Sequence, residues 1–276
     1  MAETTKWQSR EVGKFYDDGG VAWFQAIMGD NSHVGLWTGP DDTSSLREAS
    51  NRLTDLLIDK LNVGKGERVL DLGCGVGGPA ARLAARTGAE IVGVAISAAQ
   101  VEMANKLAEA EGLAGQARFE LADAMGLPFP DNSFDHVLMF ESIMHMPSRL
   151  TALAEAARVI RPGGRVVLTD LYERTEVTPD RASVVAKCLD GMFSTAAGVQ
   201  DYPRLLTDAG LRWVELADIT DQSWTRTHQE MAKEVQRMRP ELDSSLGGEF
   251  LGKSDELMST MWDIAEIGYL VATAQL

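Results

Sequence analysis

The sequence predicts a doubly wound α/β fold built on a mostly parallel sheet. Strand and helix patterns alternate through residues 50–172, which is the signature of a sheet with helices on both faces. Residues 73–78 read GCGVGG and stand between an apolar strand end and a helix start, which is typical of ligand-binding loops in such sheets. The chain has 276 residues, enough for one large domain with a buried core.

Hydrophobic spacing and capping residues predict the elements in order. Apolar residues at helical spacing predict helices, and short apolar runs predict strands. Ser97 is an expected N-cap, and Pro162-Gly163-Gly164 is expected to end the helix before it. The predicted helices are 50–61, 79–86, 97–111, 149–160, 201–211 and much of 221–264; the predicted strands are 67–72, 90–95, 117–122, 134–140, 164–171, 212–220 and 268–276.

The loop at residues 73–78 matches the dinucleotide pattern G-x-G-x-x-G, which is a weak signal by itself. Asp71 precedes these glycines, and its carboxylate would repel a pyrophosphate, which binds to helix N–H groups. The acid suits a cofactor that carries an ammonium group. An NAD-dependent dehydrogenase is therefore the least favoured enzyme class.

Composition restricts the partners. Lys and Arg number 26 against 41 Asp and Glu, so the formal charge of −15 disfavours nucleic acid as a partner. No apolar run is long enough to span a membrane and the first residues lack a signal-peptide pattern, so we expect a cytoplasmic protein. Two cysteines form neither a disulfide framework nor a metal site, and we expect no metal.

Four ordered blocks carry a resemblance to a known family. They are YDDGGVAWFQAIMGDNSHVGLW, VLDLGCGVGGPA, GVAISAAQV, and ADAMGLPFPDNSFDHVLMFESIMHM followed by VIRPGG. The chain resembles class I S-adenosylmethionine (AdoMet)-dependent methyltransferases, most closely the small-molecule branch with bacterial sugar O-methyltransferases and tocopherol methyltransferases. The resemblance implies AdoMet as cofactor and a Rossmann-like sheet of seven strands in the order 3-2-1-4-5-7-6. It also implies an N-terminal flap (1–49) over a methyltransferase domain (50–276), with lid insertions near 173–200 and 221–264.

The resemblance implies a set of cofactor-binding residues. Many class I members bind the ribose with an acid at the end of the second strand, but Ala95 stands there, so Ser97 and Gln100 are the candidates. Asp123 is expected to accept a hydrogen bond from the adenine amino group, although an Asp in a turn is often only a cap. The full set is Asp71, Gly73, Cys74, Gly75, Ile96, Ser97, Gln100, Asp123, Ala124, Met125 and Glu141, together with the flap residues Tyr16, His33 and Trp37.

Two residues are catalytic candidates. His145 follows the fourth strand, and an imidazole can be unprotonated at neutral pH and accept the proton of an acceptor hydroxyl. Asp170, at the end of the fifth strand, is expected to orient that imidazole or to bind a substrate hydroxyl. Related sugar O-methyltransferases have a His-His pair where this chain reads Met144-His145, so a packing role for His145 stays open.

The predicted second lid has an apolar side that suits a bulky, partly hydrophobic acceptor, although a core role is the common one for such residues. These residues are Trp224, Met231, Met238, Met258 and Trp262, with His228 as a weak contact candidate. The sequence favours O-methylation of a natural product or its sugar by a soluble enzyme that could be a homo-oligomer. C- or N-methylation, and an AdoMet-binding cyclase-like protein that does not methylate, remain as alternatives.

Overall fold

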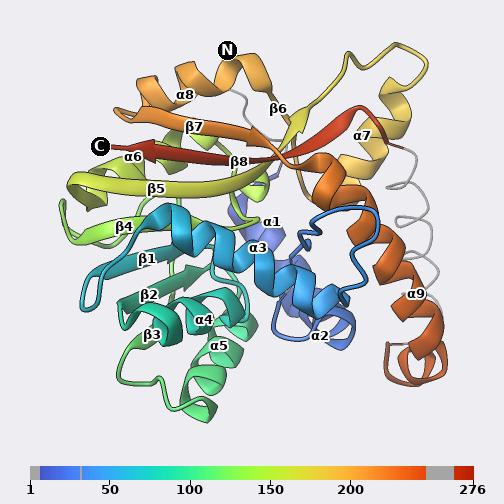
Figure 1. Ribbon diagram of the computed structural model, residues 1–276, viewed down its shortest axis with the longest axis horizontal. Coiled ribbons are helices and arrows are strands. Elements are labelled where there is room, and N and C mark those ends of the chain that lie inside the picture. Colours follow the sequence, from blue (N-terminus) through green and yellow to red (C-terminus); the bar gives the residue numbers. More distant parts are fainter. Residues whose placement is uncertain (1–6, 32, 247–263) are drawn as a thin grey trace.

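The computed structural model describes residues 7–31, 33–246 and 264–276. Its centre is one sheet in the order β3-β2-β1-β4-β5-β8-β7, with the short β6 beside β5 (Figure 1). The strands are β1 Arg68–Leu72, β2 Glu90–Ala95, β3 Ala117–Leu121, β4 Phe134–Met139, β5 Ile160–Glu173, β6 Ala197–Gly198, β7 Arg212–Asp218 and β8 Ile267–Gln275.

Helices cover the sheet and its carboxyl edge. The α-helices of the described residues are α1 Ser9–Phe15, α2 Val21–Met28, α3 Leu46–Leu61, α4 Gly78–Thr87, α5 Ala98–Ala110, α6 Arg149–Val159, α7 Ala182–Gly191, α8 Tyr202–Asp208 and α9 Thr220–Leu246. A π-helical turn (η1, Tyr16–Gly20) joins α1 to α2, and two 3₁₀ turns are η2 (Ile143–His145) and η3 (Val199–Asp201).

The predicted topology is confirmed. The last strand, β8, runs antiparallel between β5 and β7, which is the predicted insertion of the final strand between the fifth and sixth. The two-residue strand β6 brings the number to eight where seven were predicted. Because β1 and β4 are neighbours while β2 lies on the other side of β1, the chain reverses its winding direction at β1. Ligands bind at such a switch point in open α/β sheets.

The core lies on both faces of the sheet because successive strand residues point to opposite sides. Val69 belongs to the cluster under α3, α4 and α5, whereas its neighbour Leu70 packs with the residues of α6 and α8. The central strands are therefore apolar at consecutive positions, as expected for a parallel sheet covered on both faces.

Helix α3 starts at Leu46, four residues before the predicted start. Ser45 caps it: its Oγ accepts from the Glu48 N–H, and the Glu48 carboxylate accepts from the Ser45 N–H at 2.8 Å. This capping box extends the helix by one turn. The expected division between residues 49 and 50 therefore falls inside a helix.

The N-terminal segment packs against α9, as Figure 1 shows for α2 and α9 on the same side of the molecule. Ile27 and Met28 form a small apolar cluster with Met231, Val235 and Leu242 of α9. None of the described helices is long and apolar enough to cross a membrane.

Candidate active site

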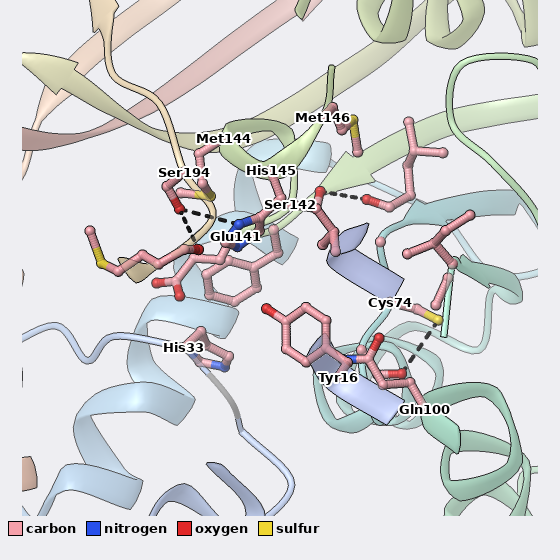
Figure 2. A pocket seen from close by; sticks show the side chains of 18 of the residues that line it. Tyr16, His33, Cys74, Gln100, Glu141, Ser142, Met144, His145, Met146 and Ser194 are labelled. Carbon is pink, nitrogen blue, oxygen red and sulfur yellow. Dashed lines mark hydrogen bonds between the residues drawn. The ribbon is translucent and has the colours of Figure 1, made fainter. Parts of the chain in front are cut away.

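A cavity of about 500 Å³ lies at the carboxyl ends of the parallel strands, under α1, η1 and α9. Figure 2 shows its side chains converging from separate parts of the chain. It brings together most of the predicted site residues. Those on its wall are Tyr16, His33, Gly73, Cys74, Gly75, Ile96, Gln100, Asp123, Ala124, Glu141 and His145.

The glycine-rich loop forms the floor of the cavity. Gly73 and Gly75 have positive φ angles of 89° and 54°, which favour glycine. A Cβ on Gly73 would lie 2.3 Å from the Cβ of Ser142, so a side chain is excluded there. A Cβ on Gly75 would meet nothing within 4 Å. The backbone at Gly75 therefore faces open space in which a ligand can approach it.

Asp71 lies behind this loop and off the cavity wall. It is 2% exposed, and its Oδ1 has no hydrogen-bond partner among the described residues. Burial raises the pKa of Asp71 to about 7. A buried carboxylate oxygen without a partner fits an amino-acid tail with an ammonium group, and the open space at Gly75 fits the approach of that tail.

The two residues predicted to bind the ribose lie in different places. Gln100 lines the cavity, but Ser97 is fully buried and lies off its wall. The Ser97 Oγ donates to Oδ1 of Asp17 at 2.6 Å and accepts from the Gln100 N–H at 3.1 Å. Ser97 is thus the N-cap of α5, and its hydroxyl ties η1 to that helix.

Asp123 and Ala124 lie on the wall as predicted, whereas Met125 does not. The Met125 side chain packs against the core, and its N–H donates to Oδ1 of Asp123 at 2.9 Å. The same oxygen accepts from the Ser9 Oγ of α1 at 3.1 Å. Ser9 also lines the cavity, and no sequence signal pointed to it.

The prediction that Trp37 binds the cofactor needs correction. Trp37 is buried, and it is not a cavity residue. Its Nε1 donates to the Ser44 carbonyl at 3.2 Å, and the Arg226 guanidinium lies 5.1 Å from the ring centroid. An apolar ring with a satisfied N–H and a cation on its face is a packing residue that fastens its loop to α9.

Three other residues surround the space in the centre of Figure 2: Tyr16, His33 and Glu141. Glu141 follows β4 with a positive φ of 47°, and its Oε1 accepts from the Val34 N–H and the Tyr269 hydroxyl, each at 2.8 Å. Burial raises the pKa of Glu141 to about 7 and lowers the pKa of His33 to about 4. The His33 imidazole is therefore neutral at pH 7.

His145 presents one nitrogen to the cavity. Its Nδ1 lies 3.0 Å from the Phe193 carbonyl and 3.2 Å from the Ser194 Oγ. Because the carbonyl can only accept, Nδ1 carries the proton and Nε2 keeps its lone pair. Burial lowers the pKa of His145, so the ring is neutral at pH 7. The Phe193–Ser194 contact lies in a stretch without a motif, so the sequence did not reveal it.

Asp170 is not at the cavity, which corrects its predicted catalytic role. It is fully buried, and its carboxylate pairs with Arg149, at 2.6 Å from Nε to Oδ2 and 3.0 Å from Nη2 to Oδ1. The Tyr202 hydroxyl also donates to it. Within the described residues no hydrogen bond joins Asp170 to His145, so the acid neither orients the ring directly nor reaches an acceptor.

Helix α9, in the predicted second lid, contributes apolar and polar side chains. Trp224, His228 and Met231 line the cavity, whereas Met238 packs in the α2–α9 cluster. Met258 and Trp262 lie outside the described residues. His136 pairs with Glu67 at 3.2 Å and accepts from the Arg165 N–H at 3.2 Å, a role within the sheet.

The family model that the chain matches and two of its relatives are methyltransferases. Residues 70–168 match the family model described as a methyltransferase domain. The chain is 38% identical to methyltransferase GfsG of Streptomyces halstedii over 96% of this chain and 94% of that protein. It is 39% identical to 27-O-demethylrifamycin SV methyltransferase of Amycolatopsis mediterranei over 80% of this chain and 82% of that protein.

Among solved structures, the [4+2]-cyclase SpnF superposes with a TM-score of 0.86 at 27% identity, over 99% of this chain and 98% of that one. The glycine loop, the buried acid behind it and the similarity over nearly the whole chain agree. The chain belongs to the class I S-adenosylmethionine-dependent methyltransferases, and AdoMet is its cofactor.

Proposed function

We propose that this enzyme methylates a hydroxyl group of a bulky, partly apolar natural product, with His145 as the general base. The observation that carries the proposal is the fixed tautomer of His145, which lines the cavity with its Nδ1 held at the Phe193 carbonyl. The relative named 27-O-demethylrifamycin SV methyltransferase supports the same acceptor class.

AdoMet supplies a methyl group on a sulfonium, which becomes a neutral thioether after the transfer. The protein must hold the acceptor oxygen in line with that methyl and remove the hydroxyl proton. The Nε2 lone pair of His145 accepts this proton, and the Phe193 carbonyl stabilises the resulting imidazolium through Nδ1–H. A histidine that activates a serine hydroxyl as a nucleophile acts as a base in the same way.

Apolar walls favour a bulky acceptor. Methionine side chains adapt to irregular ligands, and aromatic rings give large contact areas. The apolar residues on the wall include Met28, Phe140, Met144, Leu171, Met192, Trp224 and Met231.

The cofactor is expected to lie with its amino-acid tail at Gly73–Gly75 and its adenosine between Ile96, Gln100 and Asp123. All of these residues line one continuous cavity. The carboxylate of Asp71 would neutralise the tail's ammonium group from behind the loop.

Cofactor affinity should depend on pH through Asp71. Its pKa is about 7 without a ligand, and an ammonium group favours the ionised form, so binding at lower pH must release a proton. We expect the affinity for S-adenosylhomocysteine to fall by up to about tenfold per pH unit below about pH 7 and to level off above it. Calorimetry at several pH values measures this.

The matched variant is Asp71→Asn, which should bind more weakly and lose the pH dependence. S-adenosylhomocysteine carries the ammonium group but not the sulfonium charge. A cavity carboxyl such as Glu141, whose ionisation a sulfonium would favour, therefore does not contribute to the pH dependence of its affinity. A parent affinity that stays constant from about pH 5.5 to 7 would rule out this role of Asp71.

We also propose that residues 1–49 act as a flap that covers bound cofactor. Three contacts between this segment and the sheet edge support the proposal: Ser9 with Asp123, Asp17 with Ser97, and the Val34 N–H with Glu141. Such a cover excludes water from the reaction.

Asp17→Ala should weaken S-adenosylhomocysteine binding by about three- to tenfold, because it removes two hydrogen bonds that hold the flap on α5. The control is Asp18→Ala, which removes only an exposed pair with Lys14 and should bind like the parent. Equal affinities for the two variants would contradict the flap.

The decisive experiment incubates the enzyme with isotopically labelled AdoMet and a panel of hydroxylated polyketide and terpenoid acceptors, with mass spectrometry of the products. A methyl ether as product supports the proposal. The similarity to SpnF favours one alternative, a cyclase-like protein that binds AdoMet without methylating. That alternative predicts stoichiometric AdoMet binding without S-adenosylhomocysteine formation.

A further inference from the structure

The α9 wall of the cavity holds a histidine with a fixed tautomer. His228 is 3% exposed, and its Nδ1 lies 2.8 Å from the Trp224 carbonyl one helical turn earlier. The carbonyl can only accept, so Nδ1 carries the proton and Nε2 keeps a lone pair. The described residues give this nitrogen no hydrogen bond, although burial lowers the pKa of His228 to about 4 and keeps the ring neutral.

Trp224, one helical turn before His228, carries a donor without a partner in the described part of the chain. It is 7% exposed, it lines the cavity, and its Nε1–H has no acceptor among the described residues. Its ring meets the His228 ring edge-on at 4.4 Å between centroids and stacks on Tyr269 at 6.0 Å. A buried N–H without a partner is costly, which makes this group a candidate donor to a ligand oxygen.

The three histidines of the cavity differ in one respect. Both nitrogens of His33 have protein partners, the Val34 carbonyl at 2.9 Å and the Thr54 Oγ1 at 3.2 Å. In His145 and His228 the polar contacts that the described residues make are at Nδ1, to a backbone carbonyl in each and also to the Ser194 Oγ in His145, so Nε2 is left for a ligand. The cavity therefore presents two neutral imidazole acceptors, one on η2 and one on α9.

We propose that Trp224 and His228 form a second hydroxyl-binding subsite, so that the acceptor carries at least two hydroxyl groups. A hydroxyl satisfies both partners, because its oxygen accepts from Trp224 Nε1–H and its proton goes to His228 Nε2. One hydroxyl is methylated at His145 and the other is held by α9. Only the assignment of the reacting hydroxyl to His145 rests on the proposed function.

The test uses the full-length enzyme labelled with ¹⁵N-histidine and saturated with S-adenosylhomocysteine, studied by NMR at neutral pH. The chain has four histidines, so His33→Gln, His136→Gln and His145→Gln assign three resonances directly and leave the fourth to His228. The probes are benzyl alcohol and toluene, which differ by one hydroxyl. We expect His228 to be the Nδ1–H tautomer, and benzyl alcohol but not toluene to move its Nε2 resonance.

His33 and His136 are internal controls and should not respond, because their nitrogens have protein partners. Trp224→Phe keeps the ring but removes the N–H, and it should weaken the benzyl alcohol response at His228 by about three- to tenfold in affinity. An Nε2–H tautomer of His228, or a His228 resonance that benzyl alcohol leaves in place, overturns the subsite. Neither readout depends on methyl transfer, so the subsite and the proposed O-methylation can fail independently.

Discussion

Replacing His145 by alanine is expected to lower the rate of methyl transfer to a hydroxyl by about 10²–10⁴-fold. The ring keeps an available lone pair at Nε2 beside a fixed Nδ1–H, and the variant leaves no group at that place to remove the proton. Affinity for S-adenosylhomocysteine should stay close to that of the parent, because the predicted cofactor contacts come from other elements. Steady-state kinetics and calorimetry separate the two effects.

The pH profile gives a second readout of the same prediction. Burial holds the pKa of His145 below its usual 6.5, so the base is unprotonated at neutral pH and is lost only as pH falls through this lowered pKa. The parent rate should therefore be level near pH 7 and decline in acid. Ser194→Ala is the matched control: it removes a 3.2 Å contact but leaves the Phe193 carbonyl, so its rate should change little.

An unchanged rate in His145→Ala would contradict base catalysis. It would favour methylation of carbon or of an unprotonated nitrogen, for which a base matters less. Met144, which directly precedes His145, is buried and lines the cavity without offering a base.

The fold was predictable because its signals are local or periodic. The consecutive apolar positions of β1 predict a strand that is buried on both faces, as Val69 and Leu70 show. The place of Gly73 in the loop was predictable as well. Its positive φ and its approach to Ser142 leave no room for a side chain, so the structure requires the glycine that the sequence shows. Such constraints are recorded at single positions of the sequence.

The errors concern polar side chains whose partners are distant in the chain. Ser97 has the sequence context of a ribose ligand, but Asp17, 80 positions earlier, takes its hydroxyl. Trp37 belongs to a flap-like motif, yet Arg226 of α9 covers its ring. In each case tertiary packing decides whether the side chain faces a ligand or the protein, and no local pattern records that choice.

Asp170 is the clearest example, because it stands at the strand end where a catalytic acid is expected. Arg149 lies 21 positions away and neutralises it with a bidentate pair in the core. Arg149 also donates to the Thr195 Oγ1 and carbonyl, each at 2.6 Å. The pair thus fixes the segment that provides the Phe193 carbonyl to His145, and Asp170 contributes to the site through this segment.

Arg149→Met is accordingly expected to destabilise the protein by about 3–5 kcal/mol, because it leaves the Asp170 carboxylate buried without its cation. Arg158→Met is the matched control: it lies on the same helix, pairs with Glu155 and Asp131, donates to the Phe129 and Leu127 carbonyls, and is 31% exposed at its side chain. Because no buried charge is left without a partner, its loss should be smaller, about 1–2 kcal/mol. Urea denaturation of both variants measures the difference.

A double variant separates the charge effect from packing. Adding Asp170→Asn to Arg149→Met removes the unpaired charge, so the double variant should be more stable than the sum of the two single losses predicts. Additive losses would mean that the pair contributes mainly through packing. If Arg149→Met instead unfolds like Arg158→Met, the ion pair contributes little net stability, and the Tyr202 hydroxyl and the Leu171 N–H hold Asp170 without it.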